Sequence, residues 1–300
     1  MESVREILKK IRRLEVRTRG RLDTAMAGQY RSVFKGRGMN FEEVREYQPG
    51  DEVRAIDWNV TARLGEVRGD AFVKKFTEER ELTLMTLVDI SGSMSYGSTV
   101  QSKRELAAEV ASLLAFSATR NNDQAGLLLC TGEVELFLPP RKGRGHVLRL
   151  IREVLYFQPR GRETRLEAGL EYLHRVLPHR AVVFLISDFH DLTLSRTLRA
   201  ISRQHDVVAI TIVDAAEENL PAAGRVTLED PETGAQMEID TSSRAIQRQV
   251  RERVAARQAE QRAVWRRCGI DQVELRTGED YVPALRAFFR QRAHRQSLPA

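Results

Sequence analysis

The most constraining feature of this chain is a continuous apolar run that ends in three oxygen-bearing side chains. Residues 82–93 read LTLMTLVDISGS, so the apolar stretch is interrupted at Asp89, Ser91 and Ser93. A run without polar alternation is typical of a strand that is buried on both faces, as in a parallel sheet. Ligands of open α/β sheets bind in the crevice outside the carboxyl ends of the strands. The pattern therefore predicts a buried strand that leads into a polar site.

One carboxylate and two hydroxyls at such a strand end favour a hard divalent cation. Mg²⁺ prefers oxygen ligands, and it commonly takes one or two carboxylates and keeps several waters. For these residues alone, a turn that merely caps the next helix is the alternative, because Asp and Ser are frequent in turns and caps. The rest of the sequence has to decide between the two.

Two later segments offer oxygen atoms at the same edge of such a sheet. Residues 181–186 form another apolar run, which is followed by Ser187 and Asp188. Thr164 lies in the loop GRETRLEAGL, just before a predicted helix. Because ligands of these sheets bind at the carboxyl ends of the strands, Asp188 is expected beside Asp89, and Thr164 can add a hydroxyl. Three separate segments favour a metal site over a capping turn.

The order of the remaining segments predicts an α/β domain over residues 80–300. Strands and helices alternate, which is the pattern of a parallel sheet that is flanked by helices. Further strands are predicted at residues 125–130, 181–186, 207–213 and 270–275. Helices are predicted at residues 102–119, 166–177 and 242–267, with a hairpin at 226–239 and a final helix around Leu285.

Residues 1–79 are predicted to form a separate region that begins with a basic helix. Residues 3–18 have apolar side chains at helical spacing, which predicts an amphipathic helix. Residues 1–38 hold eleven Lys or Arg against four Asp or Glu, an excess that accounts for the net charge of +6. Such a segment can attract nucleic acid or an anionic membrane surface. We favour a solvated helix face with at most peripheral membrane contact and no specific nucleic acid, because charge bias lacks specificity.

A small β subdomain is predicted within residues 41–76. This segment contains short β-like stretches and the turn signal Pro49-Gly50. Four of its residues are interpreted as a buried ion-pair and aromatic cluster that fixes the subdomain to the main sheet, with a docking surface for a partner as the alternative. These residues are Asp51, Arg54, Asp57 and Trp58.

Several classes of protein are disfavoured by what the sequence lacks. No stretch approaches 18 consecutive apolar residues, and the start MESVREILKK has no apolar signal-peptide core. Cys130 and Cys268 form no CxxC pattern, which favours reduced thiols and a cytoplasmic location. The sequence has no P-loop and no HExxH motif. We therefore expect a protein that is not an enzyme.

The sequence resembles a known family at the residues that carry the predicted metal site. The stretch DISGSM matches the Asp-x-Ser-x-Ser signature of von Willebrand factor type A-like domains. More specifically, the chain resembles the Domain of Unknown Function 58 family over most of residues 20–295. The resemblance is carried by YRSVFKGRGMNFEEVREYQPGDEVRAIDWNVTAR, FVKKFTEERELTLMTLVDISGSM, LPPRKGRGHVLRLIREVL and FLISDFHD. It implies a von Willebrand A-like, doubly wound, mostly parallel sheet.

The resemblance also implies a ligand set and a mode of action. The metal-ion-dependent adhesion site of such domains would consist of Asp89, Ser91, Ser93, Thr164 and Asp188, and it would hold Mg²⁺ or Mn²⁺. The hydroxyls would contact the metal directly, and the carboxylates would act mainly through water. An acidic side chain of a partner protein would fill the open position. Glu163 and Arg165 depart from the small residues and the Asp or Asn that usually flank the threonine.

The family implies a metal-dependent protein-binding adaptor that works with a MoxR-type AAA+ ATPase in the assembly or activation of protein complexes. The alternative is a metal-dependent hydrolase that uses the same oxygen cluster. His190 would be its acid or base, since it follows Asp188 closely and imidazole titrates near neutral pH.

Overall fold

The computed structural model describes residues 40–49, 51–52, 56–62, 71–77, 81–193 and 195–297. The chain divides into two compact units, a smaller one formed by Phe34–Leu82 and a larger one that contains Thr83–Ala300. The predicted N-terminal helix and the whole basic segment, residues 1–38, lie outside the described residues. The predicted division into residues 1–79 and 80–300 stays a prediction.

The smaller unit contains an antiparallel pair of strands, which confirms the predicted β subdomain. Strand β1 (Asn40–Glu46) pairs with β2 (Phe72–Thr77). The guanidinium of Arg45 donates two hydrogen bonds, 2.8 and 2.6 Å long, to the carboxylate of Asp51. Arg54 lies outside the described residues, and the side chain of Trp58 is 65% exposed. Trp58 is therefore not part of a buried cluster, contrary to the interpretation from sequence.

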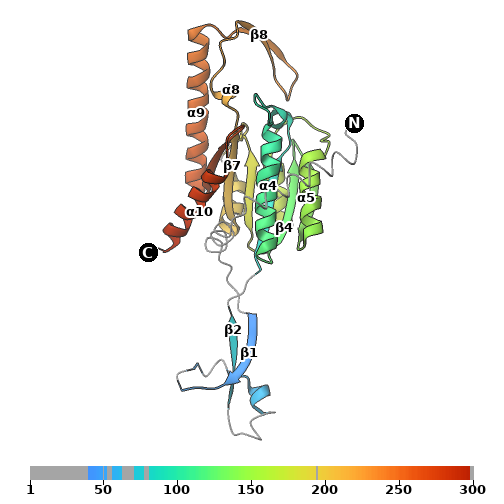
Figure 1. The fold of residues 1–300 in the computed structure, drawn as a ribbon, viewed down its shortest axis with the longest axis vertical. Coiled ribbons are helices and arrows are strands. Elements are labelled where there is room, and N and C mark those ends of the chain that lie inside the picture. Colours follow the sequence, from blue (N-terminus) through green and yellow to red (C-terminus); the bar gives the residue numbers. More distant parts are fainter. Residues whose placement is uncertain are drawn as a thin grey trace. The chain divides into compact units, whose positions relative to one another are not determined.

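The larger unit is built on a six-stranded sheet in the order β10-β7-β6-β3-β4-β5 (Figure 1). All neighbouring strands are parallel except β5, which is antiparallel to β4. The strands are β3 (Thr83–Asp89), β4 (Gln124–Cys130), β5 (Val134–Arg141), β6 (Val182–Ser187), β7 (Asp206–Val213) and β10 (Asp271–Arg276). The predicted mostly parallel α/β sheet is confirmed. Strand β5 was not predicted, because Pro139 and Pro140 near its end are tolerated only in edge strands.

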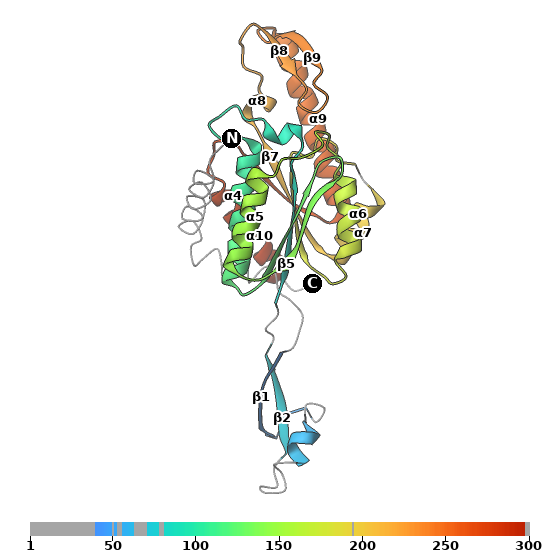
Figure 2. The ribbon, with the colours of Figure 1, turned by 90° about the vertical axis from the view of Figure 1, so that its right-hand side faces the viewer.

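Helices cover both faces of this sheet, as the edge-on view shows (Figure 2). Helices α4 (Lys103–Arg120) and α5 (Arg144–Tyr156) lie on one face, and α6 (Leu166–Val176) and α7 (Arg196–Gln204) lie on the other. Two longer helices lie nearer the end of the chain, α9 (Arg244–Cys268) and α10 (Val282–Ser297). Trp265 of α9 packs into the same apolar cluster as α6 and α7. In the described part of the chain, no helix is long and apolar enough to cross a membrane.

Local sequence signals explain where two of these helices begin and end. The hydroxyl of Ser102 accepts the backbone N–H of Glu105, and the carboxylate of Glu105 accepts the N–H of Ser102. This capping box satisfies two N–H groups that the first turn of α4 leaves without a partner in the helix. Helix α9 ends at Gly269, which adopts a left-handed conformation with φ of +65° that glycine accepts without strain.

The parallel strands bring several loops to one edge of the sheet. The single-turn helix η2 (Gly92–Ser95) follows β3, Asp188 follows β6, and α8 (Ala215–Glu218) follows β7. The predicted hairpin is formed by β8 (Arg225–Glu229) and β9 (Gln236–Asp240). It projects beyond the same end of the sheet, beside the long helix α9 (Figures 1 and 2).

The imidazole of His205, between α7 and β7, is buried in the larger unit. Its Nδ1 lies 3.2 Å from the backbone N–H of Ala181, which donates a hydrogen bond to it. Its Nε2 is buried without a hydrogen-bond partner among the described residues. Burial, followed by the influence of His174 and Arg180, lowers the pKa of His205 to about 4.

We expect His205 to make folding less favourable in mild acid. The pKa of His205 is about 4 in the folded protein, against an ordinary value of 6.5 that applies to the unfolded chain. Between these two pH values the unfolded chain therefore binds a proton that the folded protein does not. The free energy of unfolding should therefore fall as the pH drops through this window, by at most about 1.4 kcal/mol per pH unit from this group. His205→Asn, which keeps an acceptor, should reduce this slope in urea denaturation, whereas His179→Asn, at an exposed site, should not. Identical slopes in His205→Asn and the wild type would contradict the expectation.

Candidate metal site

Asp89 is the buried last residue of strand β3, and hydrogen bonds from Ser91 and Ser187 hold its carboxylate. Its Oδ1 accepts the backbone N–H of Ser91 at 2.9 Å, and its Oδ2 accepts the hydroxyl of Ser187 at 2.7 Å. The side chain is 1% exposed. Because β3 and β6 are adjacent parallel strands, Ser187 reaches Asp89 from the end of the neighbouring strand. The sheet itself therefore positions this carboxylate.

The two predicted serine ligands lie side by side at the start of η2. The hydroxyl oxygens of Ser91 and Ser93 are 3.2 Å apart, and both side chains are buried. Ser93 also makes a side-chain hydrogen bond with Asp188. A tight turn after β3 thus brings the hydroxyls of one loop against the carboxylate of another.

Asp188 is held in place by α4 and α9. Its carboxylate accepts a hydrogen bond from the ammonium of Lys103, 2.7 Å away, and both side chains are buried. The amide of Gln261 in α9 donates to the backbone carbonyls of Asp188 (3.3 Å) and Phe189 (2.8 Å). Phe189 has φ of +55°, an uncommon value for a residue other than glycine, and its ring packs edge-on against Trp265. Packing by α9 therefore supports the turn that orients Asp188.

Two carboxylates in this buried space create an excess of negative charge. Burial and the nearby charge of Asp188 raise the pKa of Asp89 to about 6. Burial also opposes ionisation of Asp188, but the Lys103 ammonium outweighs it and lowers the pKa of this carboxyl. A divalent cation beside Asp89 would favour its ionised form. The buried hydroxyls of Ser91 and Ser93 beside two carboxylates, of which Lys103 pairs with Asp188, fit the hard cation that the sequence predicts.

Thr164 lies on a neighbouring loop, and the hydrogen-bond partner of its N–H and hydroxyl is Glu232, which is not one of the predicted ligands. Its N–H donates to Glu232 at 3.2 Å, and its hydroxyl also donates to the Glu232 carboxylate. The loop itself is tied to the serine turn, because the N–H of Gly92 donates to the carbonyl of Arg162 at 2.9 Å. The flanking Glu163 and Arg165 are exposed, in contrast to the buried Thr164.

The structure thus links four of the predicted residues through direct contacts or shared charge, namely Asp89, Ser91, Ser93 and Asp188. It places the Thr164 loop beside them. Sequence reasoning missed two further residues, Lys103 and Glu232. Lys103 is the first residue of a helix, and Glu232 lies in an ordinary turn sequence, DPETG. Neither position carries a motif that could have indicated its part in the site.

Comparison with known proteins identifies the family of this chain. The family model described as "Protein of unknown function DUF58" matches residues 43–264. The chain belongs to the DUF58 family. An uncharacterized protein of Mycobacterium tuberculosis is 32% identical to this DUF58 chain over 275 residues, which cover 91% of the chain and 85% of the relative. The uncharacterized protein YeaD of Bacillus subtilis is 32% identical over 111 residues, which cover 37% of the chain and 25% of YeaD.

The DUF58 chain is also similar to solved structures at low sequence identity. The conserved hypothetical protein BatB from Bacteroides thetaiotaomicron matches with a TM-score of 0.45 and 14% identity, over 72% of this chain and 98% of BatB. The SpRpn10 VWA domain matches with a TM-score of 0.39 and 13% identity, over 69% of this chain and 94% of that domain.

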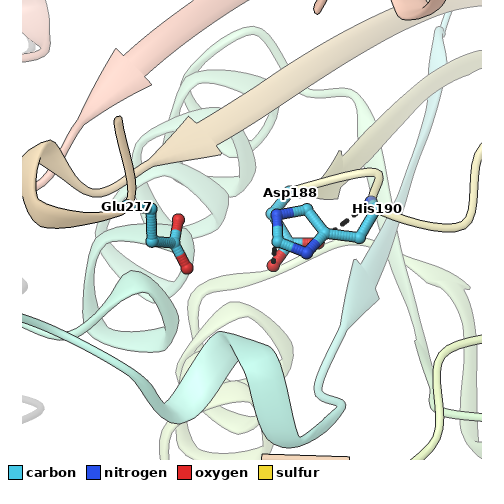
Figure 3. Close-up of side chains that lie close together, drawn as sticks. All are labelled: Asp188, His190 and Glu217. Carbon is cyan, nitrogen blue, oxygen red and sulfur yellow. Dashed lines mark hydrogen bonds and ion pairs between the residues drawn. The ribbon is translucent and has the colours of Figure 1, made fainter. Parts of the chain in front are cut away.

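A second cluster of ionisable groups adjoins the oxygen site of this DUF58 chain. Asp188, His190 and Glu217 each offer a ligand atom, and these atoms lie within 4.8 Å of one another (Figure 3). The ammonium of Lys103 also contacts Glu217, at 2.6 Å, so it joins both carboxylates of this cluster. Burial lowers the pKa of His190, against the attraction of Asp188. Lys103 already supplies the positive charge here, which makes this cluster a poorer fit to a metal than the serine turn.

We expect Lys103→Met to destabilise the larger unit strongly. The substitution removes a fully buried ammonium and leaves Asp188 and Glu217 without their shared counter-ion. Loss of one partner of a buried ion pair typically lowers the free energy of unfolding by about 3–5 kcal/mol. Urea denaturation should show this loss, whereas Lys142→Met, at an exposed position, should change stability by less than about 1 kcal/mol. A small effect of Lys103→Met would show that the carboxylates do not depend on this ammonium.

Proposed function

We propose that this protein is an adaptor that uses a divalent cation, Mg²⁺ or Mn²⁺, to hold an acidic side chain of a partner protein. The observation that carries the proposal is the oxygen cluster of Asp89, Ser91, Ser93 and Asp188, which two strand ends bring into one buried space. The resemblance of Asp89, Ser91 and Ser93 to the Asp-x-Ser-x-Ser adhesion-site signature also supports it.

Each residue of the cluster has a distinct task in this proposal. The hydroxyls of Ser91 and Ser93, together with that of Thr164, would hold the cation. Asp89 and Asp188 would orient the surrounding shell. The cation would supply the positive charge that attracts a carboxylate of the partner. The protein contributes burial, which strengthens this attraction by lowering the local dielectric.

A carboxylate held through one metal ion needs a wider interface around it. Stable protein complexes commonly bury about 1,200 Å² or more in total. Two exposed apolar side chains, Tyr96 and Val100, follow the serine turn and offer part of such a surface. As the partner we propose a MoxR-type AAA+ ATPase, which would act with this protein in the cytoplasm in the assembly or activation of other protein complexes. No catalytic step is part of this role.

The proposal predicts that partner binding depends on both the metal and Asp89. In affinity capture from native lysate, wild-type protein in Mg²⁺ should retain an AAA+ ATPase. Asp89→Ala or a chelator should each reduce recovery of the ATPase about tenfold or more. The reason is that loss of a residue that orients the metal ligands typically lowers metal affinity by about tenfold to a hundredfold. Ser95→Ala, at an exposed position in the same turn, is the matched control and should behave like the wild type. Equal recovery in all conditions would contradict the metal-dependent role.

The adjoining cluster supports one alternative, a metal-dependent hydrolase with His190 as acid or base. The imidazole Nε2 of His190 lies 3.9 Å from the carboxylate of Asp188. This proposal predicts turnover of phosphoester or peptide substrates in Mg²⁺, which His190→Ala abolishes and His179→Ala leaves intact. Absence of turnover across both substrate classes would refute it.

A further inference from the structure

The tip of hairpin β8–β9 lies against both loops of the candidate metal site. The carboxylate of Glu232 accepts two hydrogen bonds from Thr164, one from the backbone N–H at 3.2 Å and one from the hydroxyl. Glu232 is partly buried, whereas the adjacent Pro231 and Thr233 are exposed. A carboxylate of this chain is thus bound to one of the five predicted metal ligands.

A second contact joins the tip to the serine turn. A Cβ added at Gly92 would overlap the carbonyl oxygen of Pro231 and would lie 2.8 Å from its carbonyl carbon. Gly92 stands between the two predicted serine ligands. The lack of a side chain there lets the backbone of the tip approach the turn directly. Pro231 and Glu232 therefore contact the serine turn and the Thr164 loop at the same time.

The tip is stiffened by its own hydrogen bonds. The carboxylate of Asp230 accepts the N–H of Glu232 at 2.9 Å and the hydroxyl of Thr233 at 2.8 Å. The N–H of Asp230 donates to the carbonyl of Ala235, and Gly234 closes the turn with φ of +73°. These contacts fix the backbone of the tip at Glu232.

The strands of the hairpin contrast with this ordered tip. Most of their side chains are exposed, including those of Leu228 and Met237. A two-stranded hairpin without a buried face is only marginally stable on its own. The tip of the hairpin is thus held mainly by its contacts with Thr164 and Gly92, because the strands themselves pack little. Such an arm can leave the site at a small energetic cost.

We propose that Glu232 is an internal ligand of the metal site, which occupies the position of the partner's acidic side chain until the hairpin moves away. The proposal rests on the function proposed above, and it adds that the chain carries its own competitor. A carboxylate is the chemical group that the open position would accept from a partner, and Glu232 already presents one to Thr164. A partner must bind well enough to displace this arm, which lowers its apparent affinity.

Titration of the whole protein with Mn²⁺ tests this inference by calorimetry. Glu232→Gln replaces the carboxylate with a neutral amide of similar size and should weaken Mn²⁺ binding about tenfold. Glu238→Gln removes the same charge from an exposed position on the same hairpin and should leave the affinity unchanged. Asp89→Ala reports whether the metal binds at the proposed site at all.

Hydrogen exchange provides a readout that does not depend on metal affinity. Mn²⁺ should slow exchange of the backbone amides of Asp230, residues 232–235 and Thr164 in the wild type and in Glu238→Gln. It should have no such effect in Glu232→Gln. Equal Mn²⁺ affinity and equal exchange in Glu232→Gln and the wild type, with binding lost in Asp89→Ala, would overturn the internal ligand but leave the adaptor proposal standing. If the wild type does not bind Mn²⁺, or binds it as well as Asp89→Ala does, both the internal ligand and the adaptor proposal would be overturned.

Discussion

The buried ammonium of Lys103 is the interaction on which the functional end of the molecule depends. It contacts Asp188 after β6 and Glu217 in α8, so one charge connects helix α4 to two loops that follow neighbouring strands. Charges buried in this way are costly unless they are paired. The charge of Lys103 lowers the pKa of Asp188 and so favours its ionised form. Lys103 therefore supports the Asp188 side of the oxygen cluster, whereas the sheet positions Asp89.

The site combines a rigid part with a part that is held loosely. Asp89 and the serines belong to a buried strand end, whereas Glu232 lies at the tip of a largely exposed hairpin. Rigid ligands favour metal binding without further rearrangement. If Glu232 competes for the open position as proposed, a partner shifts the population of the hairpin only by its differential affinity for the two states. The proposed adaptor and its proposed control would then share one set of residues.

Much of the fold could be predicted because its signals are local. The apolar runs of β3, β6 and β7 indicate strands buried on both faces, and apolar spacing indicates the helices α4 and α6. The helices α5 and α7 were not predicted. Strand β5 escaped prediction because its prolines are acceptable only at an edge, and sequence does not reveal which strand lies there. Within the site, Asp89, Ser91 and Ser93 form a motif. Lys103 and Glu232 come from distant segments, and nothing in their own neighbourhoods marks them.

The sequence by itself determined the α/β class, the family and the strand end that carries the predicted oxygen ligands, because these depend on periodicity and on residues that are close in the chain. Only the tertiary structure decided which charges compensate Asp188 and which group meets Thr164. Lys103 is 85 residues from Asp188, and Glu232 is 68 residues from Thr164. Contacts at such separations arise from the packing of α4 and from the placement of the hairpin. Their energies depend on burial, which becomes defined only when the chain has folded.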